Sequence, residues 1–246
     1  MEFRFLNRRQ EELDGGRGIS ALFARDKDGK TLFLGTTFFI TRNGLMLTAK
    51  HCLFDSKGKS WDSIFIVQIL KDKEFVIRPI ENSYWNFSDV AVLVPQDLNI
   101  ENPIPSLTIK ILNIGETIAS YAYPNSTVFE GEKKTILNLN DVWHSGIIEE
   151  FHSDGFLFLK NPCYQSDMYI QGGSSGGPVA ENSGSVFAIN STGSDTISGI
   201  KPYSLLSPVY LCFDIKINIS VNKIKRDYSI LELIHLNYIP VMGINK

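Results

Sequence analysis

Short apolar segments separated by turn residues run through most of the chain, and they restrict what it can fold into. Two of them, residues 19–25 and 31–40, flank Asp26-Lys27-Asp28-Gly29, which is typical of a β-hairpin turn. No stretch before the C-terminus shows a long helical spacing of apolar residues. The pattern therefore predicts an all-β sandwich or barrel architecture rather than alternating strands and helices. Further strands are expected at residues 45–49, 63–70, 74–80, 90–94, 117–123, 135–139, 155–160, 178–180, 186–190 and 204–210.

The proline-rich segment 95–113 is the best candidate for a boundary between two halves of similar size. It carries Pro95, Pro103 and Pro105 among Asn and Asp residues, which discourages regular strand pairing. After Phe213 the pattern changes, because residues 228–236 place apolar side chains near helical spacing and Pro240 follows. We expect a terminal helix there, packed on the second half.

Charge and cysteine content exclude several classes of protein. A formal net charge of −3 gives no basic footprint for nucleic acid. Charged residues interrupt the first nine positions, where a secretory signal needs an apolar run of roughly 7–15 residues, and no stretch approaches the ~20 apolar residues of a membrane helix. Cys52, Cys163 and Cys212 are far apart and odd in number, which suits a reducing compartment. We expect a cytoplasmic protein with no nucleic-acid or membrane partner.

The strongest chemical signal is the segment Gly172-Gly173-Ser174-Ser175-Gly176-Gly177-Pro178. Glycines on both sides of a serine allow a tight turn and close approach of a substrate. The amides of Gly173 and Ser175 can then point to one spot, where an oxyanion would form during acyl transfer. The alternatives are a plain Gly/Ser loop or a phosphate-binding loop, but the latter needs Lys followed by Ser or Thr, and Pro178 and Val179 follow here.

A serine nucleophile needs a base, and His51 has the best context among the four histidines. It ends an apolar hairpin, in Leu47-Thr48-Ala49-Lys50-His51-Cys52, which would put the imidazole at the rim of a barrel. His144 and His152 are interpreted as surface or loop residues, and His235 falls on the expected terminal helix. No Cys/His cluster has metal-ligand spacing, so neither a metal nor an organic cofactor is expected.

These segments resemble those of chymotrypsin-like (trypsin-fold) serine proteases, and the bacterial, HtrA-like variety more than the digestive enzymes. The residues ending in Thr48-Ala49-Lys50-His51-Cys52 and the glycine turn around Ser175 occur in that family's order, and the likeness covers roughly residues 19–210. Asp89 opens Asp89-Val90-Ala91-Val92-Leu93, like the acid of that family, whereas a lone Asp before a strand would otherwise be a turn residue.

The resemblance implies two six-stranded antiparallel β-barrels, at residues 19–98 and 114–212. An N-terminal extension (1–18), a linker (99–113) and a C-terminal helical segment (213–246) complete the expected division. It further implies a serine endopeptidase whose catalytic triad is His51, Asp89 and Ser175, with the Gly173 and Ser175 amides as the oxyanion hole. Its substrate would be a protein or peptide.

The chain departs from the digestive relatives at Ser174, where they carry an Asp that pairs with a freshly cut N-terminus. Activation through that ion pair is therefore not expected. By resemblance, the primary pocket is lined by Tyr169, Ile170, Gln171, Gly172, Ser191, Thr192 and Gly193. Tyr169 stands where a preference for Arg or Lys needs an acid, so we predict a small or apolar substrate side chain. Asp167 and Asp195 leave an acidic pocket open as an alternative.

Two other functions stay open at this point. One is a catalytically silent module of protease fold that binds a peptide or protein. The other is a latent protease whose site orders only when an activating partner protein binds, and the lack of an ion-pair device at Ser174 favours it.

Overall fold

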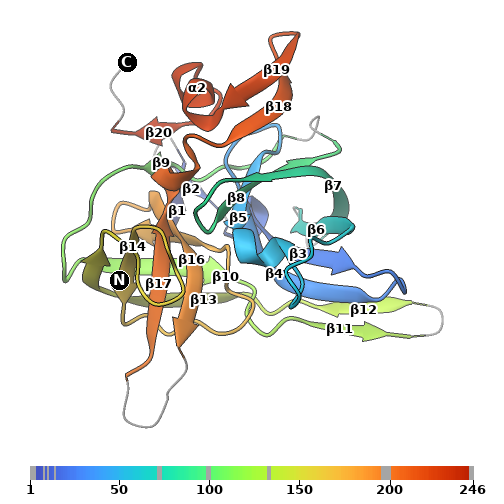
Figure 1. Cartoon of the computed structure of the whole chain (residues 1–246), viewed down its shortest axis with the longest axis horizontal. Coiled ribbons are helices and arrows are strands. Elements are labelled where there is room, and N and C mark those ends of the chain that lie inside the picture. Colours follow the sequence, from blue (N-terminus) through green and yellow to red (C-terminus); the bar gives the residue numbers. More distant parts are fainter. Residues whose placement is uncertain are drawn as a thin grey trace.

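Two six-stranded antiparallel β-barrels lie side by side in the computed structural model, as Figure 1 shows. The structure describes residues 4–7, 9, 11–13, 15–70, 74–97, 101–131, 134–194 and 201–243. The first barrel closes in the order β3-β4-β5-β8-β7-β6. Its strands are β3 (Ile19–Arg25), β4 (Thr31–Phe39), β5 (Met46–Ala49), β6 (Ser63–Ile69), β7 (Phe75–Trp85) and β8 (Val90–Pro95).

The second barrel runs in the order β15-β10-β13-β14-β17-β16, and pairing of β15 with β16 closes the ring. The two short strands β9 (Leu107–Thr108) and β20 (Val241–Met242) extend the sheet beside β16 with parallel pairing. The predicted two-barrel fold class is therefore confirmed. The strands of the ring are β10 (Thr117–Ala122), β13 (Val142–His152), β14 (Cys163–Ser166), β15 (Pro178–Glu181), β16 (Val186–Ser194) and β17 (Tyr203–Pro208).

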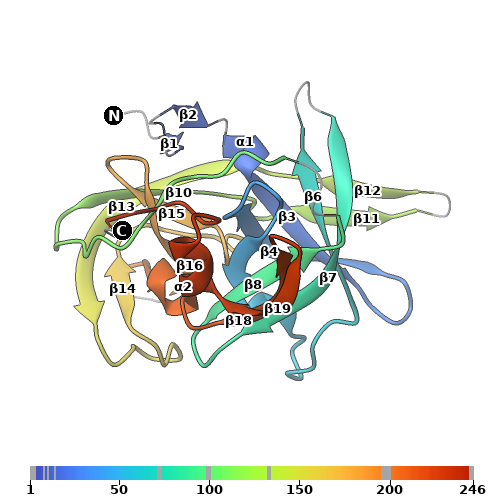
Figure 2. The same ribbon diagram turned by 90° about the horizontal axis from the view of Figure 1, so that it is seen from above.

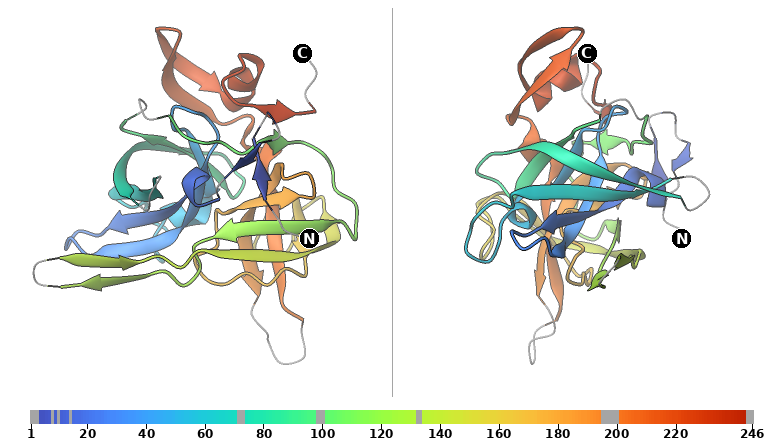
Figure 3. Two further views of the ribbon diagram at one scale, coloured as in Figure 1. Left: turned by 180° about the vertical axis from the view of Figure 1, so that it is seen from behind. Right: turned by 90° about the vertical axis from the view of Figure 1, so that its right-hand side faces the viewer.

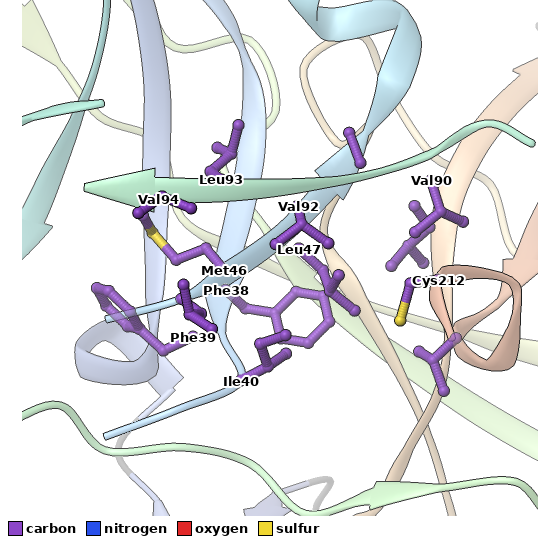
Figure 4. Packing of buried hydrophobic residues seen from close by; sticks show 14 of the residues in the cluster. Phe38, Phe39, Ile40, Met46, Leu47, Val90, Val92, Leu93, Val94 and Cys212 are labelled. Carbon is purple, nitrogen blue, oxygen red and sulfur yellow. The ribbon is translucent and has the colours of Figure 1, made fainter. Parts of the chain in front are cut away.

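The core of the first barrel explains why β5 and β8 are continuous apolar runs. Both strands are buried along their whole length, so neither face needs polar residues. Figure 4 shows Phe38, Leu47 and Val92 packed together, with Cys212 from the end of the second barrel close to Val90. Burying each large apolar side chain contributes roughly 1.5–3 kcal/mol to stability. The two barrels thus share apolar contacts, which holds their facing edges in place.

Two peripheral segments tie the barrels to each other and to the N-terminus. The strands β1 (Phe5–Leu6) and β2 (Glu12–Leu13) precede the single-turn helix α1 (Gly15–Gly18), and Phe5 stacks on Trp143 of the second barrel. The hairpin of β11 (Thr127–Glu130) and β12 (Thr135–Asn138) leaves the second barrel and extends past the first, as Figure 3 shows. Its Glu130 carboxylate accepts a hydrogen bond from the Thr31 amide at 2.8 Å.

The C-terminal segment differs from the prediction. A hairpin of β18 (Lys216–Val221) and β19 (Ile224–Ser229) comes first, and the helix α2 covers only Ile230–His235 rather than residues 228–236. Ser229 and Glu232 form a reciprocal capping box that fixes where α2 begins. Figure 2 shows this hairpin and α2 lying together over the barrels. None of the described helices is long and apolar enough to span a membrane.

Two other strand predictions were wrong in part. Residues 155–160 form a turn, in which Leu157 has a φ of 52° and a single bridge joins Phe156 to Leu159. The predicted strand 204–210 ends at Pro208, where the 3₁₀ helix η3 (Val209–Cys212) begins. In the second half of the chain, the strands β9, β11, β13, β14, β18, β19 and β20 were not predicted.

A buried arginine fastens the segment between the barrels. Arg78 is 2% exposed, and its guanidinium donates to Gln68 Oε1 at 3.1 Å, to Asn102 Oδ1 at 2.9 Å and to the Asp97 carbonyl. We expect Arg78→Met to lower the free energy of unfolding by about 2–3 kcal/mol, because it removes two hydrogen bonds between buried side chains and takes from the buried Gln68 Oε1 the guanidinium that donates to it. Denaturant unfolding measures this. Arg42→Met is the control, since the Arg42 side chain, where the structure describes its surroundings, makes one exposed ion pair with Glu101, and its loss should cost about 0–1 kcal/mol. An equal loss in both variants would contradict the prediction.

Candidate active site

His51 and Asp89 meet at the rim of the first barrel. His51 lies in the 3₁₀ turn η1 (Lys50–Leu53) directly after β5, and Asp89 directly precedes the neighbouring strand β8. The His51 ring atom Nδ1 lies 3.0 Å and 3.1 Å from the two Asp89 carboxylate oxygens. The His51 backbone amide donates to Asp89 Oδ1 at 3.0 Å. In the neutral ring this arrangement favours the proton on Nδ1, and Nε2 is then the nitrogen that can accept another.

The surroundings of the imidazole change its basicity. Burial lowers the pKa of His51, but the neighbouring Cys52 sulfur and the Asp89 carboxylate outweigh it and raise the pKa well above 6.5. A general base works only in its neutral form. Activity that depends on His51 is therefore fully present above the raised pKa and is lost as the pH falls through it.

The Ser175 turn presses against the first barrel, which explains two of the glycines around it. A Cβ at Gly176 would lie 2.2 Å from the Thr36 carbonyl oxygen, and one at Gly35 would lie 2.7 Å from the Ser175 carbonyl oxygen. Thr36 then holds the turn from the other barrel: its amide donates to the Ser175 carbonyl at 2.8 Å and its hydroxyl to the Gly173 carbonyl at 2.9 Å. The Cys52 sulfur, one residue after His51, lies 3.9 Å from the Ser175 carbonyl oxygen. The turn and the histidine therefore occupy the same seam.

The amides of Gly173 and Ser175 donate to no acceptor within the described part of the chain. Each of these N–H groups shares a trans peptide with the carbonyl of the preceding residue, and both of those carbonyls accept a hydrogen bond. The Gly172 carbonyl accepts the Asn125 amide at 2.9 Å, and the Ser174 carbonyl accepts the Gly177 amide at 3.0 Å. Because carbonyl and N–H point in opposite directions across a trans peptide, both anchors turn a free N–H away from the protein. Such a pair of donors can hold an oxyanion.

Gly173 offers a direct test of this pair of amides. Its φ of +94° lies in the region that side chains disfavour, and a Cβ would come within 2.4 Å of the Phe33 ring. We expect Gly173→Ala to displace the amide and lower kcat by ~100–1000-fold, the loss typical of removing one oxyanion donor. Gly29→Ala is the matched control, since Gly29 has a similar φ of +81°, a Cβ there meets nothing within 4 Å, and it lies in the turn between β3 and β4 rather than in the site. Rates with an activated ester substrate compare the two, and similar losses would argue against the assignment.

The two serines of the turn differ sharply in access. Ser174 is fully buried, whereas Ser175 is partly exposed. The Ser175 hydroxyl donates to the Ser191 carbonyl at 3.3 Å, and no hydrogen bond joins it to the His51 ring among the described residues. If His51 is the base for this hydroxyl, the hydroxyl has to rotate toward the ring, and catalytic hydrogen bonds that form only with substrate bound are common.

The residues expected to line the primary pocket are distributed unevenly. Tyr169 is 44% exposed, while Ile170 is nearly buried and packs against Gly193. Gln171 accepts a hydrogen bond from the Asn125 side chain at 2.8 Å, and Gly172 is open to solvent. Thr192 lines the hollow around His51. The Ser191 hydroxyl is fully buried against Ser207, so this side chain faces away from a substrate.

Asp167 and Asp195 are the two acids that left an acidic pocket open as an alternative. The Asp167 carboxylate accepts the Ile147 amide at 2.7 Å and pairs with Lys201 at 3.2 Å, so it is already neutralised. Asp195 lies outside the described residues.

The other histidines do not join the site, and two were wrongly interpreted as surface or loop residues. Both His144 and His152 lie in β13 and are at least partly buried. His152 stacks on Phe156 at 4.4 Å and bonds Gln165, and burial lowers the pKa of His144. His235 lies on α2 as expected. Among the described residues, no group of three or more His, Cys, Asp or Glu side chains is placed to hold a metal ion.

A hollow of about 510 Å³ opens beside His51 and Asp89. Phe87 and Phe158 line it and are 71% and 90% exposed, which is unusual for aromatic side chains without a partner. A larger hollow of about 930 Å³ lies between the N-terminal and C-terminal segments, but none of the three triad candidates lines it. The smaller hollow is lined by two of the three triad candidates, His51 and Asp89.

Comparison with known proteins gives one family. The model of the trypsin-like peptidase domain matches residues 35–189, a span that begins at Gly35 and includes His51, Asp89 and Ser175. No curated protein sequence matches the chain.

Solved structures share the fold at low sequence identity. The HtrA-type protease AlgW, solved with a decapeptide, superposes with a TM-score of 0.56 at 17% identity, covering 80% of this chain and 62% of that one. The serine endoprotease from Yersinia pestis gives a TM-score of 0.58 at 19% identity, covering 80% and 60%. The chain thus spans about three-fifths of the length of these proteins, and the likeness concerns the barrels.

Proposed function

The chain belongs to the family of trypsin-like peptidase domains and is a trypsin-fold serine peptidase, and from that premise we propose that it is an endopeptidase working through His51, Asp89 and Ser175. The observation that carries this proposal is the hydrogen-bonded His51–Asp89 pair, which lies against the turn bearing Ser175 and two free amides. A silent module would have no need to keep all of these parts together.

The proposed reaction follows from the position of each group. The Ser175 oxygen attacks the carbonyl carbon of the scissile peptide bond while His51 Nε2 accepts the hydroxyl proton. The Gly173 and Ser175 amides hold the oxyanion that forms. When the C–N bond breaks, His51 returns the proton to the leaving amine and an acyl-enzyme remains. Water then attacks this ester with His51 again as the base, which releases the acid and restores Ser175.

Proteins or peptides are the proposed substrates. One of the similar structures, the HtrA-type protease AlgW, was solved with a decapeptide, which supports peptide binding at a site of this fold. The near-buried Ile170 beside Gly193 and the neutralised Asp167 support our proposal that the primary pocket accepts a small or apolar side chain. Cleavage of a peptide library dominated by Arg or Lys at the cut would reject it.

Activation by a partner protein is the second candidate. It is favoured by the Ser175 hydroxyl, which bonds the Ser191 carbonyl instead of His51. A partner that shifted this hydroxyl would switch the site on. We further propose a reducing, cytoplasmic location, supported by the three free cysteines.

Labelling of the purified protein with a fluorophosphonate probe tests the proposed function. The probe reacts with an activated serine, so we expect one label per chain, located on Ser175 by peptide mapping. Labelling that occurs only in cell extract would select the partner-activated alternative. No labelling in either setting would leave a binding module and refute the proposed activity.

A further inference from the structure

One side chain of the second barrel reaches across the seam to Asp89. Asn161 lies between β13 and β14 and is 1% exposed. Its carboxamide oxygen accepts the Asp89 backbone amide at 3.0 Å. Its nitrogen donates to the Pro162 carbonyl at 2.8 Å and to the Ser207 hydroxyl at 3.1 Å. Both the oxygen and the nitrogen of this buried carboxamide therefore have hydrogen-bond partners, and the oxygen binds a backbone amide of the first barrel.

The contacts continue from Asn161 to the nucleophile. The Ser207 and Ser191 hydroxyls lie 2.7 Å apart, and both residues are fully buried in neighbouring strands. The Ser191 carbonyl in turn accepts the Ser175 hydroxyl at 3.3 Å. A chain of contacts thus runs from the Asp89 amide through Asn161, Ser207 and Ser191 to Ser175.

The position of Asp89 depends on how its backbone is held. Its carbonyl accepts the Lys50 amide at 3.1 Å, which is a contact within the first barrel. Its amide is held only by Asn161 among the described residues. Both Asp89 carboxylate oxygens face His51, so a rotation of the Asp89 backbone would change the distance between the acid and the ring. Misplacement by about 1 Å is enough to lower a catalytic rate by ~100-fold.

We propose that Asn161 is a positioning residue, which fixes Asp89, and through it His51, in register with the barrel that carries Ser175. The inference rests on the proposed function, because only a reacting serine needs this register. Asn161 is outside the triad, but in this role it joins the two halves of the site. Asn161 lies in neither the glycine turn around Ser175 nor the segment that ends at His51.

The test compares Asn161→Ala with Asn102→Ala. Asn102 is equally buried and bonds Arg78 and Gln68 away from the site, so it reports the loss of a buried amide alone. We expect kcat/KM of Asn161→Ala to fall by ~10–100-fold with little change in KM. Asn102→Ala should keep kcat/KM even if its melting temperature falls as far. Asn161→Ser replaces Asn161→Ala if the alanine variant does not fold.

A second readout separates this proposal from the proposed function. The pKa of the His51 ring, followed by NMR titration, does not require turnover, and His51→Gln assigns the signal. We expect the His51 pKa to fall by about one unit in Asn161→Ala, because the Asp89 carboxylate moves away. Lys50, Asp55 and Lys160 also line the hollow around His51, and the Cys52 sulfur also raises its pKa, but none of these groups is substituted in the two variants compared. An unchanged His51 pKa would overturn the positioning role, whereas a shifted pKa in a protein that labels with no probe would sustain it and refute the peptidase.

Discussion

Ser175→Ala is expected to abolish labelling by a fluorophosphonate and to lower kcat for peptide hydrolysis by roughly 10⁵–10⁶-fold. The loss is this large because the hydroxyl is the atom that forms the acyl-enzyme, and the remaining oxyanion donors and binding contacts supply only a residual rate. Peptide binding should survive, since the main chain of the turn is held by Thr36 and not by the serine side chain. Labelling stoichiometry by mass spectrometry and single-turnover rates measure both effects.

Ser174→Ala is the matched control for this variant. Ser174 is the neighbouring serine, but it is fully buried, and its hydroxyl has no hydrogen-bond partner among the described residues. Removing an unpaired buried hydroxyl is close to neutral for stability. Wild-type labelling is therefore expected. Loss of labelling in Ser174→Ala with retention in Ser175→Ala would show that the other serine is the nucleophile.

The first barrel could be predicted closely because its strands are short, apolar and bounded by clear turns. The predicted segment 19–25 coincides with β3, and the Asp26–Gly29 turn closes on Lys30 by a backbone hydrogen bond at 3.0 Å. The strands β5 and β8 are buried on both faces, so their apolar runs are visible without any periodicity. Local sequence decides the structure where burial is this complete.

The second barrel was harder, since its longest strand breaks the usual rules. The strand β13 contains Gly146 and two adjacent glutamates, which in sequence favour a turn. The structure requires that glycine, because a Cβ there would lie 2.6 Å from Asp167 Oδ1. At residues 155–160 the error was the opposite one, because a strand was predicted where the chain forms a turn. The apolar side chains of this segment suggest a strand, yet Phe158 at the turn is 90% exposed beside the candidate site. Only tertiary contacts distinguish these two cases.

The sequence of the C-terminal hairpin does contain a strand signal, because residues 216–221 alternate between polar and apolar side chains. Residues 216–221 alternate strictly between exposed and buried positions, as a strand on a surface should. Asn222 and Lys223 follow with φ values of 50° and 68°, the conformation of a tight hairpin turn. The prediction of a helix over 228–236 came from the apolar residues of α2, which extended the helical pattern too far toward the hairpin.

The candidate site shows the same division between local and long-range information. His51, Asp89 and Ser175 stand in recognisable segments, whereas Asn161 and Thr36 have no sequence signal for what they do. Asn161 precedes a proline in a connecting loop, and its partner Asp89 is 72 residues away along the chain. A contact of this kind depends on how two barrels pack, and no pattern within either barrel contains it.

Asp89→Asn is expected to lower kcat by ~10⁴-fold while leaving the fold intact. An amide can donate toward His51 Nδ1, which then loses its proton to Nε2, so the ring can no longer accept the Ser175 proton. Removing the negative charge also takes away one of the contacts that raise the pKa of His51. The acidic limb of the pH profile of kcat/KM, which the raised pKa places above pH 6.5 in the wild type, should therefore move to lower pH. Stopped-flow or steady-state rates between pH 5 and pH 12 test the loss and the shift together, since the raised pKa of His51 is about 11 in the wild type.

Asp62→Asn provides the control, since Asp62 is another acid of the first barrel and, within the described part of the chain, pairs with Lys59 alone on the surface. Its rate and pH profile should match those of the wild type. The direction of the shift matters more than the size of the loss, because many disruptions lower kcat but only the removal of a charge facing the ring lowers the pKa of His51. An acidic limb that stayed in place in Asp89→Asn, or moved to higher pH, would mean that Asp89 does not act on His51 during catalysis, and the assigned triad would lose its acid.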